Sequence, residues 1–362
     1  MKPRALLTQV LLRPEHSAKL TLQEWDLLIR QARYANLLGR LAHRLREGQL
    51  LQQVPAQPQR HLQSALGVAQ RQMQAVQWEV DRIALALEKI PTPFILLKGA
   101  AYSMLQLPAA QGRLFADVDI LVPKAQLEAV ELALKMHGWI TTQHDAYDQR
   151  YYRQWMHELP PMQHLSRESV LDVHHTILPI TARYHPDPNL LMAAALPLSA
   201  DNPRIQVLKP TDMLLHSATH LFHEGELHHG LRDLTDLDSL LRHFSAQDAR
   251  FWEQLIERAQ QLDLVRPLHH ALHYTHTLLD TPIPEGALRA MQHHAPHPLT
   301  QSILDSVFQR AFQPPHRSCQ DWFTRPAQWL LFIRSHWLKM PLPLLLRHLF
   351  HKAFISHKSP NV

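Results

Sequence analysis

The chain has a single cysteine, Cys319, among its 362 residues, which excludes an intramolecular disulfide. This is typical of proteins in a reducing compartment, and we expect a cytoplasmic protein. No run of 18 uncharged apolar residues occurs, so no membrane-spanning helix is expected. Near the N-terminus, Gln9, Arg13 and Glu15 interrupt every apolar run, and we predict no signal peptide.

Glycine is also scarce, at nine residues, while leucine, alanine and glutamine are abundant, a balance that favours helix. Hydrophobic residues make up 45% and charged residues 19%, as in an ordinary folded protein. The net charge of +5 suits anionic partners such as nucleotides, nucleic acids or lipid headgroups. The 28 histidines are spread along the whole chain, which indicates a compositional bias rather than one metal site.

The pattern of apolar residues divides the chain into three regions. Residues 1–90 are predicted to be helical, with a capping box at Thr21 and Glu24 and a break near residues 52–59. Residues 91–178 alternate strands and helices, with strands expected at 94–97, 118–122, 139–142, 151–165 and 169–176. Residues 179–362 are again predicted to be helical. We therefore expect an α+β fold in which a small mixed sheet is flanked by N- and C-terminal helical regions.

Two aspartates stand out on the strand predicted at residues 118–122. Asp117 and Asp119 are separated by one residue, so their side chains point to the same face of the strand. Two neighbouring carboxylates repel each other unless a positive charge lies between them. An oxygen-only pair suits Mg²⁺ or Mn²⁺, which is the simplest interpretation. The alternative is a solvated strand face or a turn with local side-chain hydrogen bonds.

Further residues for phosphate chemistry occur at the ends of neighbouring predicted strands. Lys98 and Gly99 follow the strand at 94–97, and Arg113 precedes the two aspartates. Cations and open backbone N–H groups beside a glycine turn are suited to hold a triphosphate. Asp172, on the strand at 169–176, adds a third carboxylate that can complete a metal site or accept a proton.

On these motifs, residues 94–175 resemble the nucleotidyltransferase superfamily with the DNA polymerase beta-like fold. More closely, the chain resembles a bacterial family of largely uncharacterised nucleotidyltransferases. The resemblance implies that Asp117 and Asp119 bind metal, with Asp172 as the third catalytic and metal-binding carboxylate. It also implies that Lys98, Gly99 and Arg113 bind the nucleotide.

The chain departs from the broader superfamily directly after the glycine of this motif. Most members have a glycine or serine there that grips phosphate, whereas this chain has Ala100. A hydroxyl contact to the nucleotide would then come from another residue, and Ser103 and Tyr102 are the candidates.

Histidines recur on one face of the helix predicted to begin at residue 210. His216, His220 and His223 occupy positions i, i+4 and i+7, where three imidazoles are able to hold Zn²⁺. In a chain this rich in histidine, a packed or solvated face is the commoner outcome. The functional alternative is that this helix lines the cleft and that His220 contacts the nucleotide or acceptor.

The next predicted helix carries Arg232 and Asp236 four residues apart. The simplest interpretation is an ion pair along the helix surface. The family resemblance suggests instead that an arginine and an aspartate of this helix face the active site, with Arg232 in nucleotide binding.

The C-terminal tail, residues 321–355, mixes apolar and basic residues. Packing against the helical domain is the commoner fate of such a segment, and peripheral contact with an anionic membrane is the alternative.

These features predict transfer of a nucleoside monophosphate from an NTP, with ATP favoured, to an acceptor and release of pyrophosphate. The acceptor stays open among a small molecule, a sugar, a protein and RNA. The alternative is a nucleotide- or partner-binding module of the same fold without catalysis.

Overall fold

A computed structural model of the chain describes residues 5–142, 145–223, 225, 227–341, 343 and 345. The strands are β1 (Phe94–Leu96), β2 (Asp117–Leu121), β3 (Trp139–Thr141), β4 (Met162–His164), β5 (Val170–His174), β6 (Leu196–Pro197) and β7 (Ile205–Val207). The helices before β2 are α1 (Leu6–Leu12), α2 (Leu22–Tyr34), α3 (Leu38–Glu47), α4 (Ala56–Ala86) and α5 (Lys98–Met104). The later helices are α6 (Leu127–Met136), α7 (Ala146–Trp155), α8 (Pro188–Ala193), α9 (Pro210–His223), α10 (Gly230–Gln247), α11 (Phe251–Gln261), α12 (Val265–Leu279), α13 (Glu285–Gln292), α14 (Pro298–Ala311) and α15 (Thr324–Lys339).

The strands form one mixed sheet in the order β3-β4-β5-β2-β1-β7-β6. β2 runs parallel to β5 and antiparallel to β1, while β7 runs parallel to β1. Along the chain, helices both precede and follow the segment that forms this sheet. The predicted α+β class is therefore confirmed. β6 and β7 come from residues beyond 178, so the sheet extends past the segment predicted as its core. The division of the chain into three domains at 90 and 178 stays a prediction.

One predicted strand is wrong. Residues 151–165 were expected to be extended, but the first part belongs to helix α7 and only β4 is a strand. The aromatic residues that favoured a strand are spaced for a helix, because the rings of Tyr151 and Trp155 lie 5.8 Å apart at positions i and i+4. Arg153 also anchors this helix by donating to Glu131 of α6 at 2.8 Å. Local propensity for strand is therefore overridden by packing along the helix.

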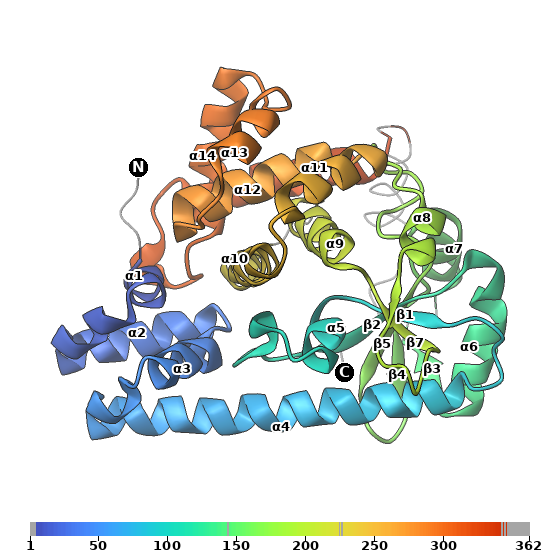
Figure 1. The fold of residues 1–362 in the computed structure, drawn as a ribbon, viewed down its shortest axis with the longest axis horizontal. Coiled ribbons are helices and arrows are strands. Elements are labelled where there is room, and N and C mark those ends of the chain that lie inside the picture. The colour runs from blue at the N-terminus through green and yellow to red at the C-terminus, as the bar shows by residue number, and fades with distance from the viewer. Residues whose placement is uncertain are drawn as a thin grey trace.

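The N-terminal helices pack around a core of their own, and helix α4 joins that core to the sheet. Thr21 and Glu24 form the predicted capping box at the start of α2. Leu231 of α10 is buried in this N-terminal core, so the C-terminal half contributes to it. Figure 1 shows α4 running beneath both the N-terminal helices and the sheet. The two cores are therefore held on one long helix.

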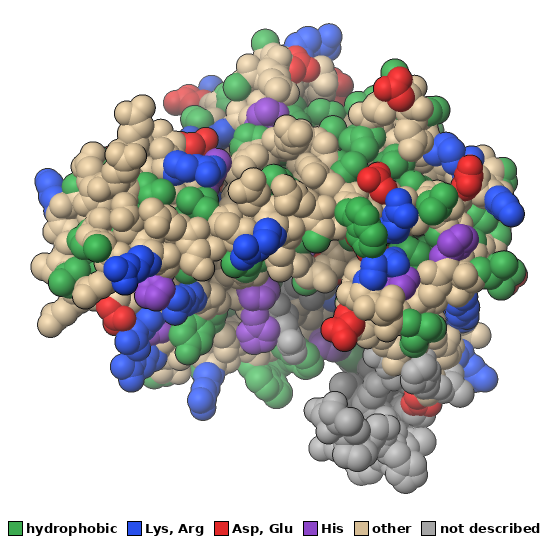
Figure 2. Space-filling view, turned by 90° about the horizontal axis from the view of Figure 1, so that it is seen from below, with side chains coloured by type: hydrophobic (Ala, Val, Ile, Leu, Met, Phe, Trp, Pro, Cys, Tyr) green, Lys and Arg blue, Asp and Glu red, His purple; other side chains and the backbone are tan. Residues whose placement is uncertain are grey.

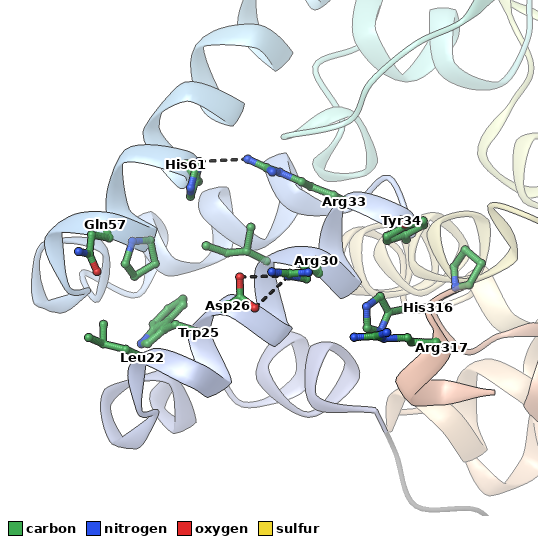
Figure 3. Close-up of a pocket in the computed structure, with 13 residues that line it drawn as sticks. Leu22, Trp25, Asp26, Arg30, Arg33, Tyr34, Gln57, His61, His316 and Arg317 are labelled. Atoms are coloured by element: carbon green, nitrogen blue, oxygen red, sulfur yellow. Dashed lines mark hydrogen bonds and ion pairs between the residues drawn. The ribbon is translucent and has the colours of Figure 1, made fainter. Parts of the chain in front are cut away.

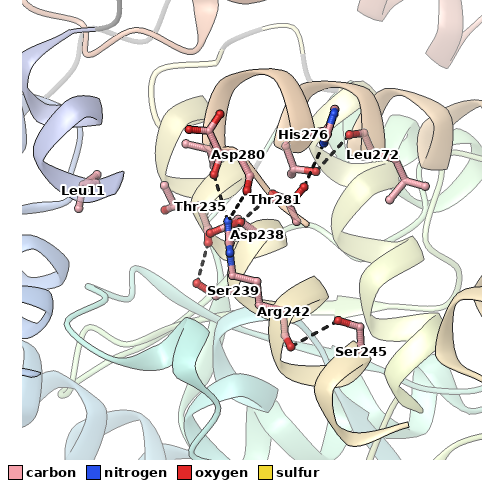
Figure 4. A network of polar contacts seen from close by, with 12 residues as sticks. Leu11, Thr235, Asp238, Ser239, Arg242, Ser245, Leu272, His276, Asp280 and Thr281 are labelled. Atoms are coloured by element: carbon pink, nitrogen blue, oxygen red, sulfur yellow. Dashed lines mark hydrogen bonds and ion pairs between the residues drawn. The ribbon is translucent and has the colours of Figure 1, made fainter. Parts of the chain in front are cut away.

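Helix α10 is fixed by a polar network at its C-terminal half (Figure 4). Arg242 donates to Asp238 at 2.6 Å and to the carbonyl of Asp280, at the end of α12, at 2.9 Å. Thr281 donates its hydroxyl to the same Asp238 carboxylate at 2.7 Å. Because buried polar groups of this kind have few alternative partners, the network determines where α10 lies against α12. The other end of α10 carries residues of the candidate site.

Within the described part of the chain, none of the helices has the length and apolar character that a bilayer crossing requires. The segment predicted as a basic and apolar tail begins as helix α15. Most of its remainder, from residue 346 on, lies outside the described residues.

Candidate active site

Neighbouring strands β2 and β5 bring the three predicted carboxylates together. Asp119 is the direct register partner of Asp172 on the parallel strand β5. Asp117 begins β2 and is exposed, while Asp119 is buried. Val118 and Ile120, between and after them, lie in the core as the strand alternation predicts. The period of two in each strand thus places three acidic side chains on one face of the sheet.

Asp119 is the best-paired of the three. Lys98 donates to its Oδ1 at 2.8 Å, and His174 Nε2 lies 3.0 Å from the same oxygen. Burial by itself would raise the pKa of Asp119, but the charge of Lys98 and the His174 hydrogen bond hold it well below the usual range. Both of these contacts use Oδ1, which leaves Oδ2 as the oxygen available to a metal.

The other two carboxylates lack such compensation. Although Asp117 is exposed as a residue, the surrounding protein removes part of the hydration of its carboxylate, and this desolvation together with the charge of Asp119 raises the pKa of Asp117. Burial, followed by the charges of Asp119 and Glu158, raises the pKa of Asp172 to about 7. One oxygen of Asp172, Oδ1, is buried without a hydrogen-bond partner. A buried and unpartnered carboxylate oxygen beside two further carboxylates fits a divalent cation, whose preferred ligands are oxygens of this kind.

Glu158 and His157 are site residues that the sequence did not reveal. Among the described residues, only His157, Glu158 and His174 form a His, Cys, Asp and Glu group whose ligand atoms all lie within 4.8 Å of one another. Glu158 reaches the site because an isolated antiparallel β-bridge pairs it with His174, the last residue of β5. Both residues lie in the segment wrongly predicted as a strand, so no sequence signal pointed to them.

Lys98 and Gly99 make a tight turn from β1 into α5. Lys98 has a φ of +43°, which is unusual for a residue with a side chain and marks local strain. A Cβ added to Gly99 would lie 2.6 Å from Arg113 Nη1 and 2.9 Å from Phe115 Cδ1. Glycine is therefore needed here so that the arginine is able to pack against the start of α5.

Arg113 does not point freely into the cavity but is held by Asp236 of α10. Its Nε donates to Asp236 Oδ2 at 2.9 Å, and Arg40 of α3 lies 2.6 Å from Oδ1 of the same carboxylate. The ion pair predicted between Arg232 and Asp236 is wrong, because Arg232 instead donates to the adjacent Asp233 at 2.9 Å. Asp236 thus joins the N-terminal helices, the sheet region and α10 at one point.

These residues line a cavity of about 110 Å³ between β2, α5, α9 and α10. Seven predicted site residues meet there: Lys98, Gly99, Arg113, Asp117, Asp119, His220 and Arg232. Ser103 and Asp172 are not among the lining residues: the Ser103 side chain is fully buried, and Asp172 lies beside Asp119 on β5. The hydroxyl groups at the cavity come from Tyr102, the alternative considered above, and from Ser217, with which it is hydrogen-bonded. Ala100 lies in the hydrophobic core.

The histidine face of α9 does not assemble a zinc site among the described residues. His216 is buried, and burial together with the nearby Lys98 charge lowers its pKa to about 3. His223 is also buried and hydrogen-bonds through Nδ1 to the Thr219 carbonyl. Burial and Lys98 likewise hold the pKa of His220 well below its usual value, so this imidazole faces the cavity in its neutral form.

A larger cavity, of about 770 Å³, lies in the N-terminal region between α2, α4 and the segment Arg317–Cys319 (Figure 3). Its charged lining is mainly Arg30, Arg33 and Arg317, with His61 and His316. Figure 2 shows Lys, Arg and His side chains over the N-terminal helices, on the left, and also at the opposite end of the same face. The one carboxylate that lines the cavity, Asp26, is paired with Arg30 at 2.9 Å. This cavity therefore lacks the acidic cluster of the β2 and β5 site.

Comparisons with known proteins agree with the geometry. No curated protein and no solved structure matches the chain. A family model described as an uncharacterised nucleotidyltransferase matches residues 21–280, which include every residue of the candidate site. Since that match spans well over half of the chain, the protein belongs to this family of uncharacterised nucleotidyltransferases.

Proposed function

We propose that the protein transfers a nucleoside monophosphate from an NTP to an acceptor in a metal-dependent reaction that releases pyrophosphate. The observation that carries this proposal is the carboxylate cluster on β2 and β5. Asp119 and Asp172 are register partners, and Asp172 Oδ1 is buried without a partner. Asp117 and Asp119 line a cavity together with Lys98, Arg113 and Arg232, cations of the kind that a polyphosphate requires, and Asp172 lies next to Asp119 on the neighbouring strand.

Asp117, Asp119 and Asp172 are the residues that would hold Mg²⁺ or Mn²⁺. When bound, the metal neutralises charge on the phosphate oxygens and favours attack at the α-phosphorus. The protein contributes a set of oxygens, two of them on carboxylates whose pKa values are raised by burial and by their acidic neighbours. Cation binding removes the repulsion that raises these pKa values, so metal affinity should increase as the carboxylates ionise.

Lys98, Arg113 and Arg232 would contact the β- and γ-phosphates. In the structure each is paired with a carboxylate: Lys98 with Asp119, Arg113 with Asp236 and Arg232 with Asp233. Such partners orient the cations before the substrate arrives. Because Arg113 uses Nε on Asp236, its terminal nitrogens are available for a phosphate.

Asp172 is the candidate for the general base. An acceptor hydroxyl would lose its proton to this carboxylate as its oxygen bonds to the α-phosphorus. The bond from the α-phosphorus to the bridging oxygen breaks in the same step, and pyrophosphate leaves with that oxygen. Its place beside Asp119 on the parallel strand β5 puts it within the acidic cluster, where a carboxylate is able to act as a general base.

The size of the cavity limits which part of the substrate it holds. At about 110 Å³ it is well below the roughly 300–1,000 Å³ of a pocket for a whole small-molecule ligand. Phosphate groups and metal fit inside it, so we infer that the ribose, the base and the acceptor bind outside. We propose ATP as the NTP. Selectivity for its base and for the acceptor would therefore be determined by residues outside the cavity lining.

The test is a variant carrying both Asp117→Asn and Asp119→Asn. It should lose Mg²⁺-dependent NTP binding and release of pyrophosphate while circular dichroism shows an intact fold. Asp201→Asn, an exposed aspartate away from the sheet site, is the matched control and should behave as the unmodified protein. Incubation with each α-labelled NTP and a cell lysate supplies possible acceptors. Wild-type turnover by the double variant would disprove the assignment.

A binding module without catalysis is the second candidate, because every cavity cation named above already has a carboxylate partner. Cations whose charge is already neutralised in this way supply less stabilisation to the charge that develops in a transition state. NTP binding without pyrophosphate release, across the same lysate acceptors, would favour this function over nucleotidyl transfer.

A further inference from the structure

Helix α15 is apolar on both of its faces. Its inner face packs against the body of the protein through Ala327, Leu331 and Leu338, all buried. On its outer face Trp329 is 69% exposed, Ile333 47% and Trp337 51%, and Trp322, just before the helix, is 86% exposed. A helix with apolar residues on two opposite faces normally contacts protein or lipid on both of them. Something apolar should therefore cover the outer face.

The exposed apolar residues form a continuous stripe. Trp329, Ile333 and Trp337 follow one another at intervals of four residues, and Leu330 lies at the side of this stripe. Pro326 and Phe332 are exposed on the same outer half of the helix. Contiguous apolar patches with several tryptophans are uncommon on monomeric proteins and mark interaction surfaces.

Basic residues lie beside this stripe. From Trp322 to Val362 the sequence contains lysine or arginine at six positions and no aspartate or glutamate, and Asp321 directly precedes this segment. Arg325 is exposed one turn before Trp329. Arg183, from the loop before α8, lies over the Trp337 ring with its guanidinium carbon 3.2 Å from the ring centroid. A basic border around an aromatic and aliphatic stripe is complementary to an anionic surface with an apolar interior.

We propose that the outer face of α15 is a docking surface for anionic lipid bilayers, with the helix lying in the plane of the headgroups. Tryptophan favours the interface because its ring is apolar and its N–H is polar. The cations would contact lipid phosphates, and the Trp329, Ile333 and Trp337 side chains would enter the acyl boundary. The proposal is independent of the nucleotidyl-transfer chemistry, because it uses none of the cavity residues.

The experiment is sedimentation of the full-length chain with vesicles of phosphatidylglycerol and phosphatidylcholine, compared with vesicles of phosphatidylcholine alone. We expect binding to the anionic vesicles that weakens in 0.5 M salt, since surface charge attraction is screened. Trp329→Ala combined with Ile333→Ser should weaken this binding at least about tenfold, because both substitutions remove apolar area from the membrane contact. Arg325→Glu should weaken it for the anionic vesicles.

A matched control exists on α14, where Leu299 and Ile303 are also four residues apart and exposed. Leu299→Ser with Ile303→Ser should leave vesicle binding unchanged. Circular dichroism of all variants checks folding. Absence of wild-type binding to anionic vesicles would overturn the proposal, as would equal binding by the α15 and α14 variants. Sedimentation velocity tests whether this face instead joins two copies of the chain. A dimeric unmodified protein and a monomeric α15 variant with unchanged vesicle binding would show a dimer contact and overturn the proposal.

Discussion

The two halves of the candidate site differ in how their charges are satisfied. On β2 and β5, Asp117 and Asp172 lie among other acids, and their pKa values are raised. On the side of α5 and α10, each cation has a carboxylate within 2.9 Å: Lys98 with Asp119, Arg113 with Asp236 and Arg232 with Asp233. One half therefore carries an excess of negative charge, and the other is close to neutral.

The difference indicates how the two halves are used. Carboxylates that repel one another reduce the stability of the folded protein. Such clusters are typical of cation-binding sites, because a bound cation removes the repulsion and stabilises the folded state. Arginines that are paired with carboxylates keep their positions in the absence of nucleotide. When nucleotide binds, their remaining N–H groups are able to donate hydrogen bonds to its phosphates. We therefore expect substitutions in the acidic half to change metal binding and catalysis. We expect substitutions in the cationic half to change the stability of the fold and the affinity for nucleotide.

The largest effect is expected for Asp172→Asn. Asparagine retains the shape of the side chain but neither ionises nor accepts the acceptor's proton. Nucleotidyl transfer should fall by roughly 10²–10⁴-fold, the usual contribution of a general base, measured as release of pyrophosphate. If the variant kept more than a tenth of the activity, Asp172 would not be the base.

Asp236→Asn should have the next largest effect, and on stability. The change leaves the buried guanidiniums of Arg40 and Arg113 without their counter-charge. Removing one member of a buried ion pair costs about 3–5 kcal/mol of unfolding free energy. Urea denaturation followed by circular dichroism measures it. Asp233→Asn, which changes a more exposed pair, is the control and should cost far less. Equal losses for the two variants would contradict a buried junction at Asp236.

Gly99→Ala should weaken NTP binding about tenfold, since a Cβ there displaces Arg113, whose charge-assisted contacts are worth about 1.5–3 kcal/mol each. Titration calorimetry with NTP and Mg²⁺ gives the affinity. Gly67→Ala, in the middle of α4 with open space around it, is the matched control. It should leave affinity unchanged and stabilise the helix by up to about 1 kcal/mol. Unchanged affinity in Gly99→Ala would show that Arg113 does not contact the nucleotide.

The smallest effect concerns pH. The pKa of Asp172 is raised from 3.8 to about 7 in the folded protein, so the folded chain binds this proton more tightly than the unfolded chain does. The stability of the metal-free protein should therefore fall as pH rises from about 4 to 7. Asp172→Asn should remove this loss and raise the melting temperature of the metal-free protein at pH 8 by about 2 °C. Mg²⁺ should stabilise the unmodified protein more than the variant. A melting temperature lowered by the substitution would mean that the carboxylate is not strained.

The sequence pointed to residues of both halves of the candidate site but not to how their charges are paired. Strand periodicity placed Asp117 and Asp119 on one face, and a second strand supplied Asp172. The pairing of Arg113 with Asp236 was not predictable, because these residues are 123 positions apart. The local rule of i, i+4 pairing instead favoured Arg232 with Asp236, and Arg232 binds its neighbour Asp233. Ser103 was chosen for its hydroxyl, but the rotation of α5 buries it and presents Tyr102.

By itself, the sequence determined the strands that carry the carboxylates, the tight turn at Gly99 and the helical regions around the sheet, because these depend on spacing between near neighbours. Only the tertiary structure decided that Lys98 binds Asp119, that Asp236 holds both Arg40 and Arg113, and that Glu158 reaches His174. It also added β7 beside β1 from a region expected to be helical. Partner choice among buried charges depends on which elements pack together, and the pattern of one segment does not contain that information.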